Sequence, residues 1–237
     1  MKYVLIFSCL FAEMQVHSQT LMDFKRNVQQ NMQRTSASFT QDEAVRALRD
    51  ALQKGAVWAA EKVHQADGYF KNPKIKIPLP PDAQQAESRM RSMGLGNTVD
   101  EAVLNLNRAA EAAGESAKEV FVQAIKNLTA EDAISIIKGQ TTAGTQYLKD
   151  QSGSQLYQRF KPIIEQALQQ VGATRHYTAL AEQYNRIPGV AKINPNLADF
   201  TTQKAIEGLF LLIGEEEQNI RANPAARTTE LLKKVFQ

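Results

Sequence analysis

Hydrophobic side chains recur at helical spacing along most of the chain. From residue 40 onward, apolar positions repeat every three or four residues, as Ala44, Leu48, Ala51 and Leu52 do. Short segments that contain glycine or polar residues separate one such stretch from the next. The pattern predicts an all-α fold: a single compact domain over residues 40–237, with about nine amphipathic helices and short loops.

Several helix ends carry capping signals. Residues 98–101 (TVDE) match a capping box, which predicts that a helix begins at Thr98 and runs to about residue 113. Thr129 is expected to cap a short helix over 130–138. Asn223 and Pro224 combine a capping residue with a first-turn proline, which predicts a final helix over 225–236.

Other boundaries follow from glycine, proline and the apolar pattern. We expect helices over 40–64, 82–93, 115–128, 142–149 and 175–184. A further helix is expected to begin at Ser154, and Pro162 inside it predicts either a kink or a new start. Residues 197–220 are the most apolar of all and are expected to form the central helix.

Residues 74–79 (KIKIPL) alternate polar and apolar positions, the one strand-like pattern in the sequence. Prolines at 73, 78, 80 and 81 surround this segment, so it cannot be a central strand. We predict an extended, proline-flanked arm that lies on the helical body and is fixed there by Ile75, Ile77 and Leu79.

The first residues resemble an export signal. A positive start is followed by an uncharged apolar run over 3–12 and a small-residue site at 16–18, which predicts a signal peptide over residues 1–18. Lipidation at Cys9 and a buried N-terminal helix remain as alternatives. Residues 19–39 are polar and predict a flexible leader. The expected location is therefore the bacterial cell envelope, either the periplasm or its periphery.

Composition excludes some classes of function. The net charge is +3 and the basic residues are scattered, which argues against nucleic acid as a partner. After the signal, the longest apolar run (208–213) is too short to span a bilayer, so no transmembrane segment is expected in the mature chain. Cys9 is the only cysteine, so the mature chain is expected to lack thiol chemistry.

The search for reactive groups gives few candidates. His64 and His176 have no partner at a metal-ligand spacing, so no metal site is predicted, and no cofactor motif or catalytic serine motif is recognisable. We therefore expect no catalytic residue, no metal and no cofactor.

Four charged residues are the candidates for ligand binding: Arg108, Glu111, Arg221 and Arg227. Asn107 and Glu111 share the alanine side of one helix and lie beside Arg108. Arg221 and Arg227 flank the break at 223–224, and Arg221 lies four residues after Glu217, a spacing at which the two could pair. They could hold neighbouring helices in register and bind carbonyl or carboxylate groups of the chain, or they could bind a ligand carboxylate or phosphate.

Five strings carry a resemblance to a known family: NPKIKIPLP (72–80), NRAAE (107–111), FKPI (160–163), VGAT (171–174) and NPAARTTELLKKVF (223–236). With them the chain resembles the bacterial domain of unknown function 4197 family over about residues 40–237. The resemblance implies an exported helical protein and no established activity. Leu106 and Glu207 depart from the expected pattern, as do residues 142–145.

Three hypotheses about function follow. The first is an envelope binding or scaffolding protein, with an apolar groove for a lipid, a small ligand or a partner segment, closed by an arm over 72–81. The second is a hydrolase-like enzyme that uses Glu111, Arg108 and Arg227. The third is a purely structural homo-oligomer.

Overall fold

The computed structural model describes residues 39–172 and 196–236, with a few single positions between 177 and 194. Within these residues the fold is all-α and contains no strand, as predicted, and the helices form a single domain. The elements are α2 (Gln41–His64), η1 (Pro81–Ala83), α3 (Gln84–Ser92), α4 (Gly96–Gly114), α5 (Ala117–Lys126), α6 (Ala130–Lys138), α7 (Ala143–Gln170), α9 (Leu197–Ala222), η2 (Pro224–Ala226) and α10 (Glu230–Val235).

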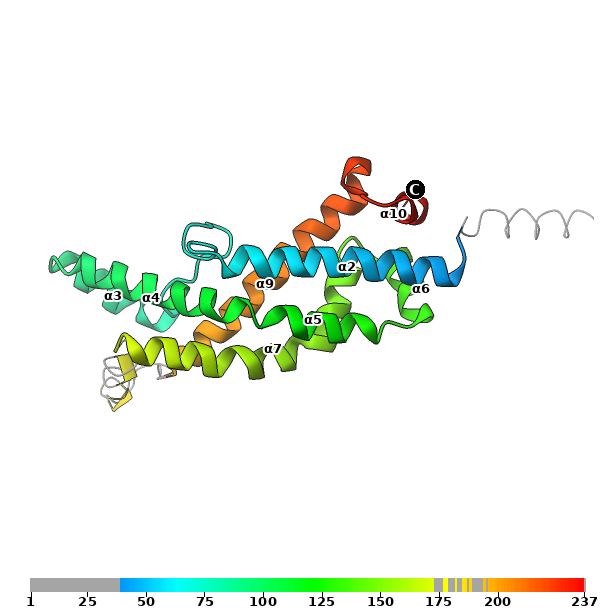
Figure 1. The fold of residues 1–237 in the computed structure, drawn as a ribbon. Helices are drawn as coiled ribbons and strands as arrows, with labels where there is room; N and C mark the ends of the chain where they lie inside the picture. Colours follow the sequence, from blue (N-terminus) through cyan, green and yellow to red (C-terminus); the bar gives the residue numbers. More distant parts are fainter. Residues whose placement is uncertain are drawn as a thin grey trace, which may run out of the picture. The chain divides into compact units, whose positions relative to one another are not determined.

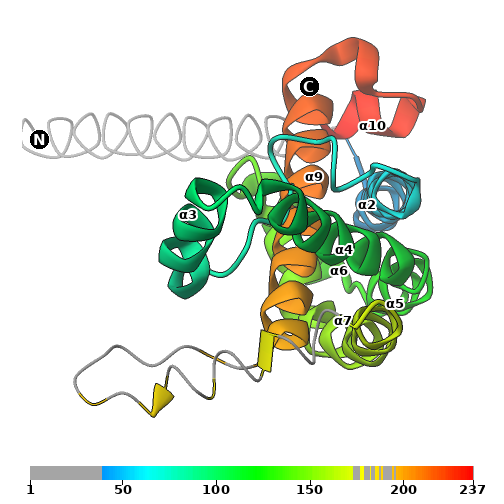
Figure 2. The same ribbon diagram turned by 90° about the vertical axis from the view of Figure 1, so that its left-hand side faces the viewer.

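The long helices form a layer that α9 crosses. In Figure 1, α2, the α4–α5 pair and α7 run side by side, and Figure 2 views them nearly end-on. Helix α9 crosses this layer at a steep angle and contacts α2, α4 and α7. It also buries apolar residues on several of its faces, which agrees with the prediction that the helix over 197–220 is the central one.

The break predicted between residues 149 and 154 is wrong, because α7 continues through both Gly153 and Pro162. Ser152 and Gly153 interrupt the apolar pattern in the sequence. In the structure Ser152 is fully buried, and its hydroxyl donates to the carbonyl of Leu148. It therefore belongs to a buried stripe at four-residue spacing, which also contains Leu148, Leu156, Phe160, Ile164 and Leu168.

Two of the predicted helix starts need correction. Helix α3 ends in a Schellman motif around Gly94 (φ 82°), with the Leu95 amide bonded to the Met90 carbonyl, so α4 begins directly at Gly96 and Thr98 lies inside it. Asn223 caps only the short η2 turn, whereas Thr229 caps α10. The predicted cap at Thr129 is confirmed as a capping box.

The arm between α2 and η1 is present and lies on the helical body. Ile75 and Ile77 are buried, as predicted, whereas Leu79 is half-buried. The chain forms turns up to Ile75, and between residues 76 and 80 it has no helix, strand or turn. A Cβ atom on Gly208 of α9 would lie 3.0 Å from the Cβ of Ile75, so this glycine allows the arm to approach α9 closely.

Some predictions fall outside the described residues. These are the signal peptide over 1–18, nearly all of the polar leader over 19–39, and most of the helix expected over 175–184. Within the described part of the chain, no helix combines the length and apolar character needed to cross a bilayer.

Candidate functional site

The four candidate ligand-binding residues divide between two separate sites. Arg108 and Glu111 lie on α4, where they face the first turns of the arm. Arg221 lies in the last turn of α9, and Arg227 lies just beyond η2. We call these two groups the arm site and the corner site.

Glu111 is the centre of the arm site. Its side chain is 5% exposed, and its Oε1 atom accepts hydrogen bonds from the backbone amides of Tyr69 (3.1 Å) and Phe70 (3.2 Å). Its Oε2 atom accepts from Nη1 of Arg108 at 2.6 Å. The carboxylate is thus bonded on both oxygens, as a buried charge requires, and it holds the arm against α4.

Arg108 extends this network to the surface. Its Nη2 atom donates to Oδ1 of Asp67 at 2.6 Å, and Asp67 also pairs with Lys71. Hydrogen bonds from Lys71 and then Arg108 lower the pKa of the Asp67 carboxyl. Asp67 has a positive φ of 68°, so the bonds to its side chain stabilise the turn at which the chain leaves α2.

Asn107 and Tyr69 fasten the rest of the arm. The Asn107 amide accepts from the Ile77 amide (2.9 Å) and donates to the Ile77 carbonyl (2.8 Å), as a neighbouring β-strand would. The hydroxyl of Tyr69 donates to the carbonyl of Ala205 on α9 at 2.7 Å. Complete burial, and then the nearby charge of Glu111, raise the pKa of Tyr69, so its phenol is neutral.

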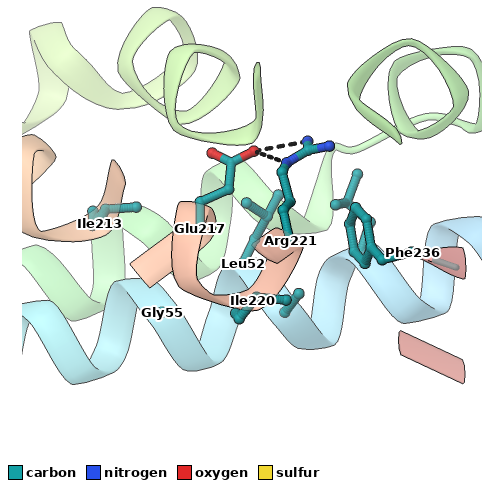
Figure 3. Close-up of a pocket in the computed structure, with 9 residues that line it drawn as sticks. Leu52, Gly55, Ile213, Glu217, Ile220, Arg221 and Phe236 are labelled. Atoms are coloured by element: carbon teal, nitrogen blue, oxygen red, sulfur yellow. Dashed lines mark hydrogen bonds and ion pairs between the residues drawn. The ribbon is translucent and has the colours of Figure 1, made fainter. Parts of the chain in front are cut away.

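The corner site is built around Glu217 of α9 (Figure 3). Its two carboxylate oxygens accept from the backbone amides of Gly144 (2.9 Å) and Thr145 (2.7 Å), and from the Thr145 hydroxyl. These donors form the amino end of α7, where a negative charge is stabilised by the helix dipole. Arg221 completes the site with two further hydrogen bonds to Oε1.

Three arginines cap the carboxyl ends of helices. Arg221 donates to the carbonyls of Ile136 and Ile137 at the end of α6. Arg227 donates to the last carbonyls of α9, at residues 220 and 221. Arg49 does the same for α5, at residues 126 and 128. A cation at this position satisfies free carbonyls and opposes the negative end of the helix dipole.

A small pocket adjoins the corner site (Figure 3). Leu52 and Gly55 of α2, Ile213 and Ile220 of α9, and Phe236 line it, and the Glu217–Arg221 pair lies at its edge. The centroid of the Phe236 ring is 5.0 Å from the Arg221 guanidinium, so this lining residue also contacts the Glu217–Arg221 pair. Its volume of about 20 Å³ has room for a single water molecule.

Neither site offers a set of ligands for a metal. Among the described residues, no three His, Cys, Asp or Glu side chains gather around a common point. His64, the histidine that the structure describes, places Nδ1 3.0 Å from the carbonyl of Glu111. In both sites the charged groups bind backbone and one another, so the arrangement that the geometry supports is a fastening between segments.

The sequence pointed to some members of these sites and missed others. The four-residue spacing of Glu217 and Arg221 predicted their pairing, which the structure confirms at 2.8 Å. Tyr69, Asp67 and Thr145 were missed as site residues. The sequence Asp67-Gly68 is typical of a turn and of nothing more, and nothing in the sequence indicates that Thr145 lies at the start of a helix facing Glu217.

Comparison with known proteins agrees with this architecture. Residues 38–237 match a family model described as "Protein of unknown function (DUF4197)". The chain belongs to this family. The match covers the arm, both sites and all the described helices. No curated protein and no solved structure matches the chain significantly.

Proposed function

We propose that this family member is an exported scaffolding protein of the bacterial envelope, which binds its partner on its outer surface and not inside the helical body. The export step depends on the signal pattern over residues 1–18. The outer-surface mode of binding is inferred from how the arm packs against the helices. One observation supports it: the arm, which was expected to close an apolar groove, is itself packed against the helices, with Ile75 and Ile77 buried.

The arm is fastened too firmly to act as a simple cover. The arm buries its own Ile75 and Ile77 side chains against the helices, and Asn107 and Glu111 bind its backbone at four points. If the arm opened, these bonds would be exchanged for bonds to water, at a net cost of about 0.5–1.5 kcal/mol for each neutral bond and about 1.5–3 kcal/mol for each bond to the charged Glu111. This supports a body that presents a fixed surface.

The enzyme hypothesis is weaker because its candidate groups are engaged. Glu111 is bonded by backbone amides and Arg108, and Arg227 is bonded to helix carbonyls. A general base or an anion-binding arginine must instead reach a substrate. Neither Glu111 nor Arg227 lines the small pocket at the corner site or the two hollows along the arm.

Native mass spectrometry of the purified mature chain, combined with lipid extraction and sedimentation, tests the proposal. We expect the mass of the bare polypeptide, with no retained lipid. A tightly bound acyl ligand would establish the carrier hypothesis instead. A stable oligomer whose assembly is the protein's only activity would favour the structural hypothesis.

Substitutions at the two sites test the enzyme alternative. Glu111→Gln keeps an acceptor for the amides of Tyr69 and Phe70 but removes the charge, and Arg227→Ala removes a helix cap. We expect both to lower the melting temperature and, below that temperature, to complement a deletion strain. The exposed Arg159→Ala is the matched control. A variant that is as stable as the control but fails to complement would support catalysis.

A further inference from the structure

The outer side of the arm carries an unusual combination of side chains. Two shallow hollows adjoin at Lys74, one between the arm and α2 and the other between the arm and α9. Large apolar side chains lie on both flanks: Trp58 of α2 is 40% exposed and Leu211 of α9 is 44% exposed. We call this surface the arm face, and it comprises Trp58, Lys62, Lys74, Lys76, Lys204 and Leu211.

The arm face is positively charged. Five lysines and three carboxylates line the two hollows. The carboxylates pair with lysines, as in Lys74–Glu215 at 2.7 Å and Lys204–Glu207 at 2.6 Å. No described carboxylate pairs with Lys62 or Lys76, and the Lys76 ammonium lies 4.3 Å from the centroid of the Phe70 ring. The excess positive charge therefore faces solvent on both sides of Lys74.

Trp58 adds a large aromatic side chain to the arm face. It is the only tryptophan in the chain, and it stands on the same face of α2 as Lys62, one turn away. Tryptophan is enriched where proteins meet the headgroup region of a bilayer, and lysines extend their charged ends to phosphate while their stems cover apolar surface. The hollows are shallow and are lined by three segments: α2, the arm and α9. Such a surface fits a broad, flat partner better than a narrow extended peptide.

We propose that the arm face binds the surface of a membrane that contains anionic phospholipids. Lys62 and Lys76 supply the attraction to phosphate, and Trp58 and Leu211 enter the headgroup region on either side. The bonds from Glu111 and Asn107 to the arm would then contribute to binding, because they hold the arm lysines in position before the protein meets the membrane. This inference depends on the proposed outer-surface mode of binding and names the partner for it.

Vesicle binding by the full mature chain tests this proposal. With equimolar phosphatidylglycerol and phosphatidylcholine, we expect co-sedimentation, a blue shift of the Trp58 emission, and weaker binding as salt is raised. With phosphatidylcholine alone, we expect little binding. Because Trp58 is the only tryptophan, its emission reports directly on this face.

Matched variants test whether vesicle binding depends on the arm face or only on the net charge of the protein. The double change K62Q/K76Q should weaken binding to the anionic vesicles by roughly 30-fold, from the usual contribution of two lysines near such a surface. K126Q/K149Q removes the same charge from exposed positions on α5 and α7 and should change binding less than threefold. Leu211→Gln should reduce the Trp58 shift, whereas Met93→Gln, at another exposed apolar position, should leave it intact.

The outcomes distinguish this inference from the scaffold proposal. Equal effects of the two lysine pairs, or vesicle binding with unchanged Trp58 emission, would overturn the arm face as the membrane contact. Binding of polyglutamate in place of vesicles would overturn it in favour of an acidic protein partner. In each case a bare chain in native mass spectrometry would leave the scaffold proposal standing. An internal lipid would reject the scaffold proposal, and the arm face would then have to be tested on its own by the vesicle results.

Discussion

The carboxylate of Glu217 lies 2.8 Å from Nη2 of Arg221, one turn further along α9, and through this pair α9 holds the ends of two other helices. Glu217 binds the amino end of α7, and Arg221 binds the carboxyl end of α6. Each charge therefore meets the helix dipole of opposite sign as well as its partner. The pair connects segments that are far apart in the sequence without leaving either charge unpaired.

Removing one member of this pair is expected to be costly. Glu217→Ala would leave Arg221, which is 11% exposed, without its carboxylate, and we expect a loss of about 3–5 kcal/mol in the free energy of unfolding. Urea denaturation measures it. Glu230→Ala removes the exposed pair with Lys233 and should cost below about 1 kcal/mol. Equal losses in the two variants would show that the corner site does not stabilise the fold.

Two glycines in helices should respond in opposite ways to alanine. Gly153 of α7 has no neighbouring atom within 4 Å of an added Cβ, so Gly153→Ala should stabilise by about 0.5–1 kcal/mol. At Gly208, the added Cβ would lie 3.0 Å from the Cβ of Ile75 and 3.1 Å from the Cε1 of Tyr69. We expect Gly208→Ala to destabilise by about 1–3 kcal/mol.

Thermal unfolding of both glycine variants tests the close approach of the arm to α9. A neutral or stabilising Gly208→Ala would mean that the arm can move away from α9 at little cost. The fastening argument, and with it the proposed rigid arm face, would then be weakened.

Asn107→Leu should release the arm locally. Leucine is close to asparagine in size, but it leaves the Ile77 amide and carbonyl without their bonds to the side chain. We expect faster cleavage by trypsin after Lys74 and Lys76, and a global loss of about 2–4 kcal/mol for two unpaired buried groups. Asn105→Leu, at a half-buried position on the same helix, is the control. Cleavage at the same rate in both variants would contradict the role of Asn107.

Much of the fold could be predicted from the sequence because most helices bury one apolar stripe. The predicted helix boundaries were wrong where a polar residue belongs to the buried stripe, or where a helix begins after a turn without a side-chain cap. Ser152 looked like a boundary, yet it is buried and bonded to Leu148. Thr98 has the sequence pattern of a helix cap. However, the turn at Gly94 places the start of α4 at Gly96, two residues before Thr98.

The two sites could be predicted only in part, for a related reason. Spacing along one helix shows which side chains share a face, and so it predicted the Glu217–Arg221 pair and the inward position of Glu111. Their remaining partners lie elsewhere in the chain: Tyr69 for Glu111, and Thr145 for Glu217. These contacts depend on how helices pack, which periodicity does not specify.

The buried phenol of Tyr69 should make stability fall at high pH. Burial raises its pKa above the ordinary value of 10.0, so the folded chain favours the neutral form. The resulting stability is fully present below pH 10 and is lost as the pH rises further, since the unfolded chain ionises first. Tyr69→Phe should flatten this decline, while costing about 1 kcal/mol at neutral pH for the lost bond to Ala205.

Urea denaturation between about pH 8 and 11 measures this dependence. Burial also raises the pKa of Tyr147, but its side chain is only half-buried, so Tyr147→Phe should flatten the decline less. If the Tyr69→Phe curve ran parallel to that of the natural chain, Tyr69 would be reachable by water. The arm would then lie less tightly on α9 than its bond to Ala205 indicates, and a rigid surface for binding would be hard to maintain.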